Sequence, residues 1–97
     1  MSKSKSVRPA TKAELDRLYG ALAQLDKKKD IAALLVDMCT IREVEEMSQR
    51  LEVARLLDKK MPYIAITEKT GASATTIARV AKALNHGAGG YAKVLDS

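Results

Sequence analysis

The stretch that decides the fold is residues 62–84, PYIAITEKTGASATTIARVAKAL. Pro62 suits the first turn of a short helix, because its fixed φ angle and missing N–H group fit that position. Gly71 interrupts the helical pattern, and Ser73 is a favourable N-cap for a second helix that runs to about Leu84. Two short helices joined by a glycine-containing turn are typical of a helix-turn-helix.

The second helix of this motif has an apolar face and a polar face. At about 100° per residue, the positions predicted to be buried are Ile77, Val80, Ala81 and Leu84. The opposite face offers short side chains that let a helix approach base edges, hydroxyl groups, and cations that reach guanine or phosphate. Lysines flank the motif where backbone phosphates would lie. The residues predicted to contact DNA are Lys60, Lys69, Ser73, Ala74, Thr75, Thr76, Ala78, Arg79 and Lys82.

Further helices are predicted on both sides of the motif. Thr11 and Thr40 each stand three residues before a glutamate, which is the spacing of a capping box, and each opens a run of apolar residues at helical intervals. Upstream we expect helices over residues 11–25, from an N-cap at Asp30 to Met38, and from Thr40 to about Lys59. Downstream, a glycine-rich segment precedes a last docking turn at Tyr91, Val94 and Leu95. No strand pattern competes, so the sequence predicts an all-α protein.

The long helix that begins after Thr40 is apolar around most of its circumference. It starts with a stripe formed by Ile41, Val44, Met47 and Leu51. The apolar surface is then widened by Val53, Ala54, Leu56 and Leu57. A helix that is apolar nearly all round is buried on several sides. In a chain of 97 residues without Phe or Trp, part of that burial is expected to come from a second subunit.

The length and composition predict a single domain that is stabilised neither by a disulfide nor by a structural metal ion. Residues 1–10 are expected to form a disordered basic N-terminal arm and residues 11–97 one helical domain. One cysteine and one histidine exclude an intrachain disulfide and a Cys/His metal cage. No apolar run approaches the ~20 residues that cross a bilayer, and the N-terminus lacks the apolar stretch of a secretory signal. We therefore expect a cytoplasmic protein with no membrane partner.

Basic charge gathers at the two ends of the chain. Residues 1–10 carry three positive charges and no negative one, residues 11–58 carry eight basic and ten acidic side chains, and residues 59–97 carry six basic and two acidic. This asymmetry gives the arm and the C-terminal part the character of a polyanion-binding surface. Lysines that only solvate helices would produce a similar distribution.

Two functional classes are disfavoured. Cys39 has no histidine in a recognisable catalytic arrangement, and Glu43, Glu45 and Glu46 are best explained as helix N-terminal charges, so no enzyme is predicted. Three tyrosines are the only aromatic residues. This disfavours proteins that hold single-stranded nucleic acid, because such proteins usually stack bases on aromatic rings.

Residues 40–90 also resemble the Trp repressor superfamily, and most of all its YerC/YecD-type branch. The resemblance is carried by QRLEVA at 49–54, TGAS at 70–73, TIARV at 76–80 and GGY at 89–91, and the upstream helices fit as well. It implies a Trp-repressor-like fold with six helices per chain in an intertwined homodimer. It also implies that the two helix-turn-helix motifs enter successive major grooves of a palindromic double-stranded DNA operator, as a transcriptional repressor does.

The resemblance further implies a corepressor pocket between the central helices and the helix-turn-helix. The positions that match this pocket are Thr40, Arg50, Thr76, Arg79 and Ala83. Ala83 replaces a serine hydroxyl, and Ile41 replaces a proline. Losing a hydroxyl that satisfies a buried ligand amine costs about 1–3 kcal/mol, so L-tryptophan is not expected as the ligand, although another small-molecule corepressor stays open. The alternative is that Arg50 pairs with a carboxylate such as Glu46 while Arg79 contacts DNA.

The sequence therefore predicts a homodimeric, sequence-specific DNA-binding regulator that needs no cofactor. Two alternatives remain at this level. One is a helical protein-interaction module whose helix-turn-helix no longer binds DNA. The other is a sequence-independent DNA-binding protein that acts through charge alone.

Overall fold

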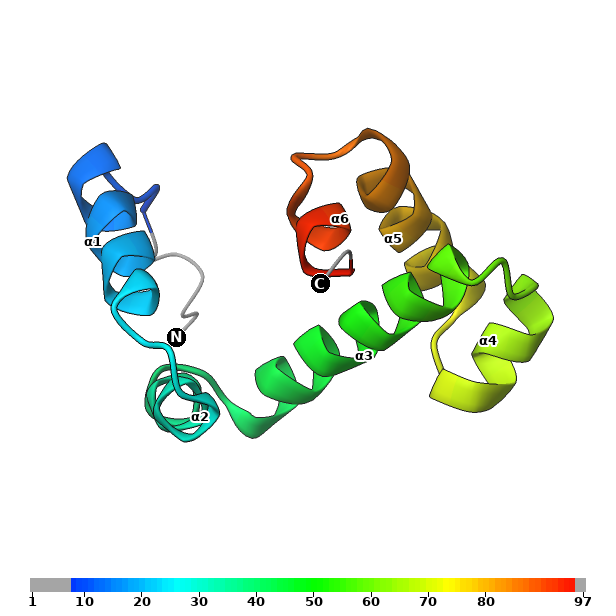
Figure 1. Ribbon diagram of the computed structural model, residues 1–97, viewed down its shortest axis with the longest axis horizontal. Helices are drawn as coiled ribbons and strands as arrows, with labels where there is room; N and C mark the ends of the chain where they lie inside the picture. Colours follow the sequence, from blue (N-terminus) through cyan, green and yellow to red (C-terminus); the bar gives the residue numbers. More distant parts are fainter. Residues whose placement is uncertain (1–7, 96–97) are drawn as a thin grey trace. The chain divides into compact units, whose positions relative to one another are not determined.

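The computed structural model describes residues 8–95, which form helices and connecting turns with no strand among them (Figure 1). The six helices are α1 (Lys12–Ala23), α2 (Lys28–Met38), α3 (Ile41–Asp58), α4 (Tyr63–Thr70), α5 (Ala74–His86) and α6 (Gly90–Leu95). The prediction of an all-α, six-helix fold is confirmed. The chain divides into two compact units, Met1–Met38 and Cys39–Ser97, which are taken in turn. Most of the predicted disordered arm, residues 1–7, lies outside the described residues.

The first unit contains α1 and α2, and its N-terminal cap forms as predicted. The Thr11 hydroxyl accepts a hydrogen bond from the Glu14 N–H, and the Glu14 carboxylate accepts one from the Thr11 N–H. Arg8 adds two hydrogen bonds to the same carboxylate, at 2.9 and 2.8 Å. These bonds, with the Thr11 N–H, lower the pKa of Glu14 to about 2. Arg8 is thus tied to the start of α1.

The predicted N-cap at Asp30 is wrong. The carbonyl oxygen of Lys27 accepts hydrogen bonds from the N–H groups of Asp30 and Ile31, so α2 begins at Lys28. Asp30 lies in the first turn of α2, where its negative charge complements the helix dipole. Lysine is a good helix former, and it extends the helix into a segment that the sequence pattern suggested was a linker.

The second unit is organised around α3. The capping box of Thr40 and Glu43 opens this helix as predicted, with hydrogen bonds of 2.8 and 3.0 Å. The C-terminal half of α3 packs against α4 and α5, and α6 returns alongside α3 and α5 (Figure 1). The buried core consists of Val53, Ala54, Leu56, Ile66, Ala72, Ile77 and Val80. Ala54 and Ala72 contribute to this core by their small size, because a small side chain lets neighbouring backbones approach closely.

The first apolar stripe of α3 lies outside this core. Ile41 is 79% exposed, and Met47 and Leu51 are 37% and 42% exposed. The broad apolar circumference of the helix is therefore only partly covered within one chain. Neither α1 nor α2 buries a side chain, although both carry apolar stripes.

The helix-turn-helix forms between Pro62 and His86. Pro62 is the N-cap of α4, one position before the predicted first turn, and α5 extends to His86 rather than ending near Leu84. α4 ends at Gly71 and the Ser73 side chain caps α5, both as expected, and Gly71 adopts the left-handed conformation (φ 77°). The Thr70 hydroxyl donates to the Ile66 carbonyl and accepts from the Ala72 N–H, which fixes the turn between the helices.

The turn between α3 and α4 places a lysine in a conformation that favours glycine. The Lys60 N–H donates to the Leu57 carbonyl and the Met61 N–H donates to the Leu56 carbonyl, which is the hydrogen-bond pattern of a Schellman motif. Lys60 occupies the left-handed position of this motif, with φ 67°. A side chain there is strained.

Replacing Lys60 with glycine should therefore stabilise the protein. We expect Lys60→Gly to raise the free energy of unfolding by about 1 kcal/mol, measured by urea unfolding at a fixed protein concentration. Gly71→Ala is the converse control, because it adds a side chain at a left-handed position and should lower the free energy of unfolding. A Cβ there meets only the Gln49 amide at 3.9 Å, so the loss of stability would come from the backbone. Equal stability of Lys60→Gly and the parent protein would contradict the strain at Lys60.

Candidate nucleic-acid interface

The outward face of α5 presents the side chains predicted to contact DNA. Ile77 and Val80 are buried against the core, and the helical rotation then turns the opposite face to solvent. The exposed residues on and beside this face are Ser73, Ala74, Thr75, Ala78, Arg79 and Lys82. Thr76 is half-buried. Short side chains alternate with two cations, which is a surface that suits the major groove.

The hydroxyl groups at the start of α5 differ in whether they form hydrogen bonds within the protein. The Ser73 hydroxyl accepts from the Thr76 N–H at 3.1 Å and donates to the Thr76 hydroxyl at 3.2 Å. Both groups thus take part in the helix cap. Thr75 makes no side-chain hydrogen bond within residues 8–95. Thr75 is the hydroxyl of this turn that is free for a base edge.

Lys60 and Lys69 are exposed at the two ends of α4, where the sequence placed phosphate contacts. Lys69 and Lys59 lie close enough to Glu52 of α3 to act on its carboxylate. The pKa of Glu52 is lowered, first by hydrogen bonds from Arg55 and then by the nearby charges of Arg55, Lys59 and Lys69. The effect of Lys69 on Glu52 joins α4 to α3, so it has no signature in local sequence spacing.

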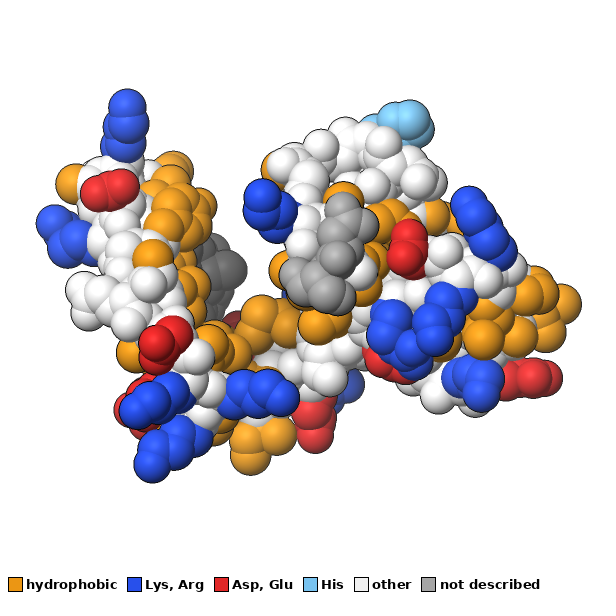
Figure 2. Space-filling model, viewed as in Figure 1, with side chains coloured by type: hydrophobic (Ala, Val, Ile, Leu, Met, Phe, Trp, Pro, Cys, Tyr) orange, Lys and Arg blue, Asp and Glu red, His pale blue; other side chains and the backbone are white. Residues whose placement is uncertain are grey.

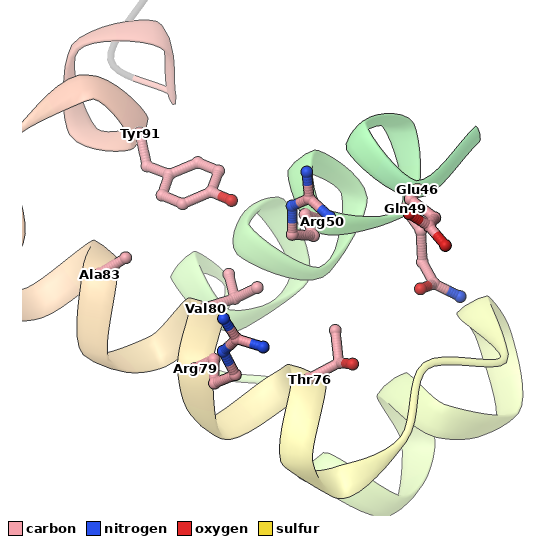
Figure 3. A pocket seen from close by; sticks show the side chains of 8 residues that line it. All are labelled: Glu46, Gln49, Arg50, Thr76, Arg79, Val80, Ala83 and Tyr91. Carbon is pink, nitrogen blue, oxygen red and sulfur yellow. The ribbon is translucent and has the colours of Figure 1, made fainter. Parts of the chain in front are cut away.

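A pocket of about 450 Å³ opens between α3, α5 and α6 (Figure 3). Its lining residues are Glu46, Gln49, Arg50, Thr76, Arg79, Val80, Ala83 and Tyr91. Four of the residues assigned to a pocket from the resemblance are thus brought together: Arg50, Thr76, Arg79 and Ala83. Thr40 does not line the pocket, because it stands at the N-cap of α3 with its hydroxyl bound to Glu43. Sequence reasoning missed Glu46, Gln49, Val80 and Tyr91.

The two arginines of the pocket keep their positive charges available. Glu46 forms its ion pair with Arg42, at 3.5 Å, and not with Arg50 as the alternative had it. Within residues 8–95, neither Arg50 nor Arg79 is ion-paired. Figure 3 shows Arg50 extending from α3 and Arg79 from α5, with the ring of Tyr91 directed toward the same space.

The lining of the pocket combines charged and apolar side chains. Val80 lines it and is 2% exposed. Ala83 presents only a methyl group. A pocket of this kind favours a ligand with an anionic group and a small apolar body. Arg79 belongs both to this pocket and to the outward face of α5.

No group of three or more His, Cys, Asp or Glu side chains between residues 8 and 95 is placed to hold a metal ion. In the same range, every helix is too short or too polar to cross a membrane.

The six-helix fold with its helix-turn-helix is the fold of a DNA-binding regulator. The family model described as Trp repressor protein matches residues 13–97, and the chain belongs to this family. It is 41% identical to the uncharacterized protein YerC from Bacillus subtilis (strain 168) over 83 residues, which cover 86% of this chain and 80% of that protein. The resemblance to the superfamily and to its YerC-type branch is confirmed.

Solved structures of similar proteins share the fold. A TrpR-like protein from Eubacterium eligens ATCC 27750 superposes with a TM-score of 0.83 at 41% identity, covering 89% of this chain and 88% of that one. A proposed Trp repressor from Staphylococcus aureus superposes with a TM-score of 0.82 at 32% identity, covering 99% and 93%.

The pocket leads to a prediction about tryptophan. Because Ala83 offers no hydroxyl to a ligand amine, we expect sub-millimolar L-tryptophan to leave the thermal midpoint of unfolding unchanged, measured by calorimetry. Ala83→Ser is the matched variant, and a rise in its midpoint on adding tryptophan would show that the hydroxyl is the missing group. A clear rise in the parent protein would contradict the prediction.

Proposed function

We propose that the protein is a homodimeric, sequence-specific regulator of transcription that binds a palindromic double-stranded DNA operator and acts as a repressor. The observation that carries this proposal is the outward face of α5, where Thr75, Ala78 and Arg79 are exposed together on a helix held by a buried inner face. α5 would lie in the major groove. No enzymatic activity and no cofactor are part of the proposal, and the cytoplasm is the compartment in which it would act.

The position of each cation on α4 or α5 determines whether we assign it to bases or to phosphates. Arg79 is long enough to reach guanine from the outward face of α5, and Lys82 follows it on the same face. Lys60 and Lys69 stand at the ends of α4, beside the recognition helix, and would meet phosphates. Arg8 is held by Glu14, so the contribution of the arm would come mainly from the lysines before it.

Homodimerisation is supported by the apolar surface that one chain leaves uncovered. The large apolar side chains exposed on α1, α2 and α3 are Leu15, Tyr19, Val36, Met38, Ile41, Met47 and Leu51. So many exposed apolar side chains on the amphipathic helices of each unit favour coverage of both units by another chain. Burying them in a second copy would also supply the symmetry that a palindromic operator requires.

The pocket supports regulation by a small molecule other than tryptophan. Unpaired Arg50 and Arg79 would attract an anionic group, and Arg79 would then link the pocket to the DNA-contacting face. The competing functions are a protein-interaction module and a DNA-binding protein without sequence preference. Failure to bind any duplex at low salt would favour the first, and a steep salt dependence with no preferred sequence would favour the second.

Two substitutions should separate base recognition from phosphate contact. On an operator selected from random duplexes, Arg79→Ala should reduce discrimination at particular base pairs by about 1–3 kcal/mol. Lys60→Ala should weaken operator and scrambled duplex alike. It should also reduce the slope of log affinity against log salt by about 0.9 for each phosphate contact that the substitution removes. Fluorescence anisotropy titrations at several salt concentrations measure both effects.

The reverse pattern would contradict this docking. If Arg79→Ala left the specificity ratio intact while Lys60→Ala lowered it, the motif would meet DNA in another orientation. Lys60→Gly serves as a control, because it removes the same charge and also relieves the backbone strain at this position. It should match Lys60→Ala in binding and differ from it in stability.

The dimer is tested at Ile41, which is 79% exposed in the single chain. Ile41→Glu places a charge on the surface proposed to be covered by the partner, and should shift sedimentation from dimer toward monomer. Glutamate in the first turn of a helix is favourable, so lost helix propensity would not explain the effect. Ile64→Glu is the matched control, because Ile64 is 77% exposed on α4 and should leave the dimer intact. A parent protein that sediments as a monomer would contradict the proposal.

A further inference from the structure

An apolar edge, formed by Tyr63 and Ile64, lies at the start of α4, outside the core. Ile64 is 77% exposed and Tyr63 is 43% exposed. Figure 2 shows hydrophobic side chains gathered over α4 next to a group of lysine and arginine side chains. The DNA-contacting residues assigned from the sequence include the lysines that flank this edge and none of its apolar members.

The edge faces away from the core because of the helical rotation. Ile66 is fully buried between α3 and α5, the two helices that α4 contacts. Ile64 stands two residues earlier, which is about 200° around the helix. Its side chain therefore points directly away from the core. No described residue covers it.

The charges around the edge favour an anionic occupant. Lys59 and Lys60 precede α4 and are exposed, and the first turn of α4 has no acidic residue and no side-chain cap. The acidic residue on the same outer flank, Glu68, lies one turn further along. A second copy of the chain placed symmetrically on this edge would bring two sets of lysines together, so self-association here is disfavoured by charge.

An apolar contact inside a basic surface fits the major groove of DNA better than a protein. The C5-methyl group of thymine is an apolar feature of base edges, and side chains recognise it by van der Waals contact. In a helix-turn-helix the first helix crosses the DNA backbone beside the groove that holds the second helix. Ile64 is exposed in the first turn of that first helix, next to Lys60.

We propose that Ile64, with Tyr63 beside it, is a second base-reading element that contacts a thymine methyl group in each operator half-site. The inference rests on the proposed function, since it requires α5 to lie in the major groove. It adds a specificity determinant outside α5. It also defines one feature of the operator, a thymine at the base pair beneath the start of α4.

Uracil substitution tests this contact, because deoxyuridine differs from thymidine only by the missing methyl group. In the selected operator, symmetric thymine pairs would be replaced by uracil one position at a time. At one position we expect a loss of about fourfold in affinity per half-site, the effect of one buried methyl-sized group. Ile64→Ala should lose affinity for the thymine operator by a similar factor and should no longer distinguish uracil from thymine at that position.

Thr67→Ala is the matched control. Thr67 is exposed on the same flank of α4, one turn beyond Ile64, and its substitution should leave the uracil penalty intact at every position. Circular dichroism of both variants should match the parent, because both side chains are exposed.

Each other outcome overturns the proposal in a distinguishable way. If Ile64→Ala retains the full uracil penalty at every thymine, the operator is bound but Ile64 does not read it. The same holds if Ile64→Ala alters only self-association at high protein concentration, since the edge is then a protein contact. If the parent protein binds all duplexes equally or binds none, the proposed function is wrong, and this inference is wrong with it.

Discussion

The packing of Ile66 and Ile77 against the C-terminal half of α3 is the contact on which the second unit depends. Both side chains are fully buried, together with Val53 of α3. Each of the two isoleucines comes from a different helix of the helix-turn-helix, so this small cluster fixes α4 and α5 to the long helix at the same time. Ala54 and Ala72, 0% and 1% exposed, allow the approach. Larger side chains there would force the backbones apart.

In this arrangement only the inner face of α5 takes part in the core, and its outer face carries polar and charged side chains. The core consists of seven aliphatic side chains with no buried polar group among the described residues. Its inner positions cannot change without cost, and the outer positions are free to serve binding. Arg79 is the exception, because it reaches both the outward face and the pocket between α3, α5 and α6. A single side chain thereby joins two surfaces that are otherwise separate.

The sequence predicted the elements of this fold better than the site between them. The capping boxes at Thr11 and Thr40 and the turn at Gly71 are local features, and they could be identified because their hydrogen bonds join residues only a few positions apart. Asp30 was misplaced because a cap residue and a first-turn acid look alike in sequence. Tyr91 and Gln49 could not be assigned to the pocket, since their place in it depends on how α6 and α3 meet α5. The resemblance to a family supplied Arg50 and Ala83 where spacing gave no guidance.

Gln49 joins the pocket to the turn of the helix-turn-helix. Its side-chain amide donates a partly buried hydrogen bond of 3.0 Å to the Thr70 carbonyl, next to the left-handed Gly71. The turn is thus tied to α3 by a bond that closes over 21 residues of chain. Proteins open locally in contiguous cooperative units, and a partly buried bond of this kind links the turn to the unit that contains α3. We therefore expect the amide hydrogens of the turn to exchange with solvent in the same opening event as those of the C-terminal half of α3.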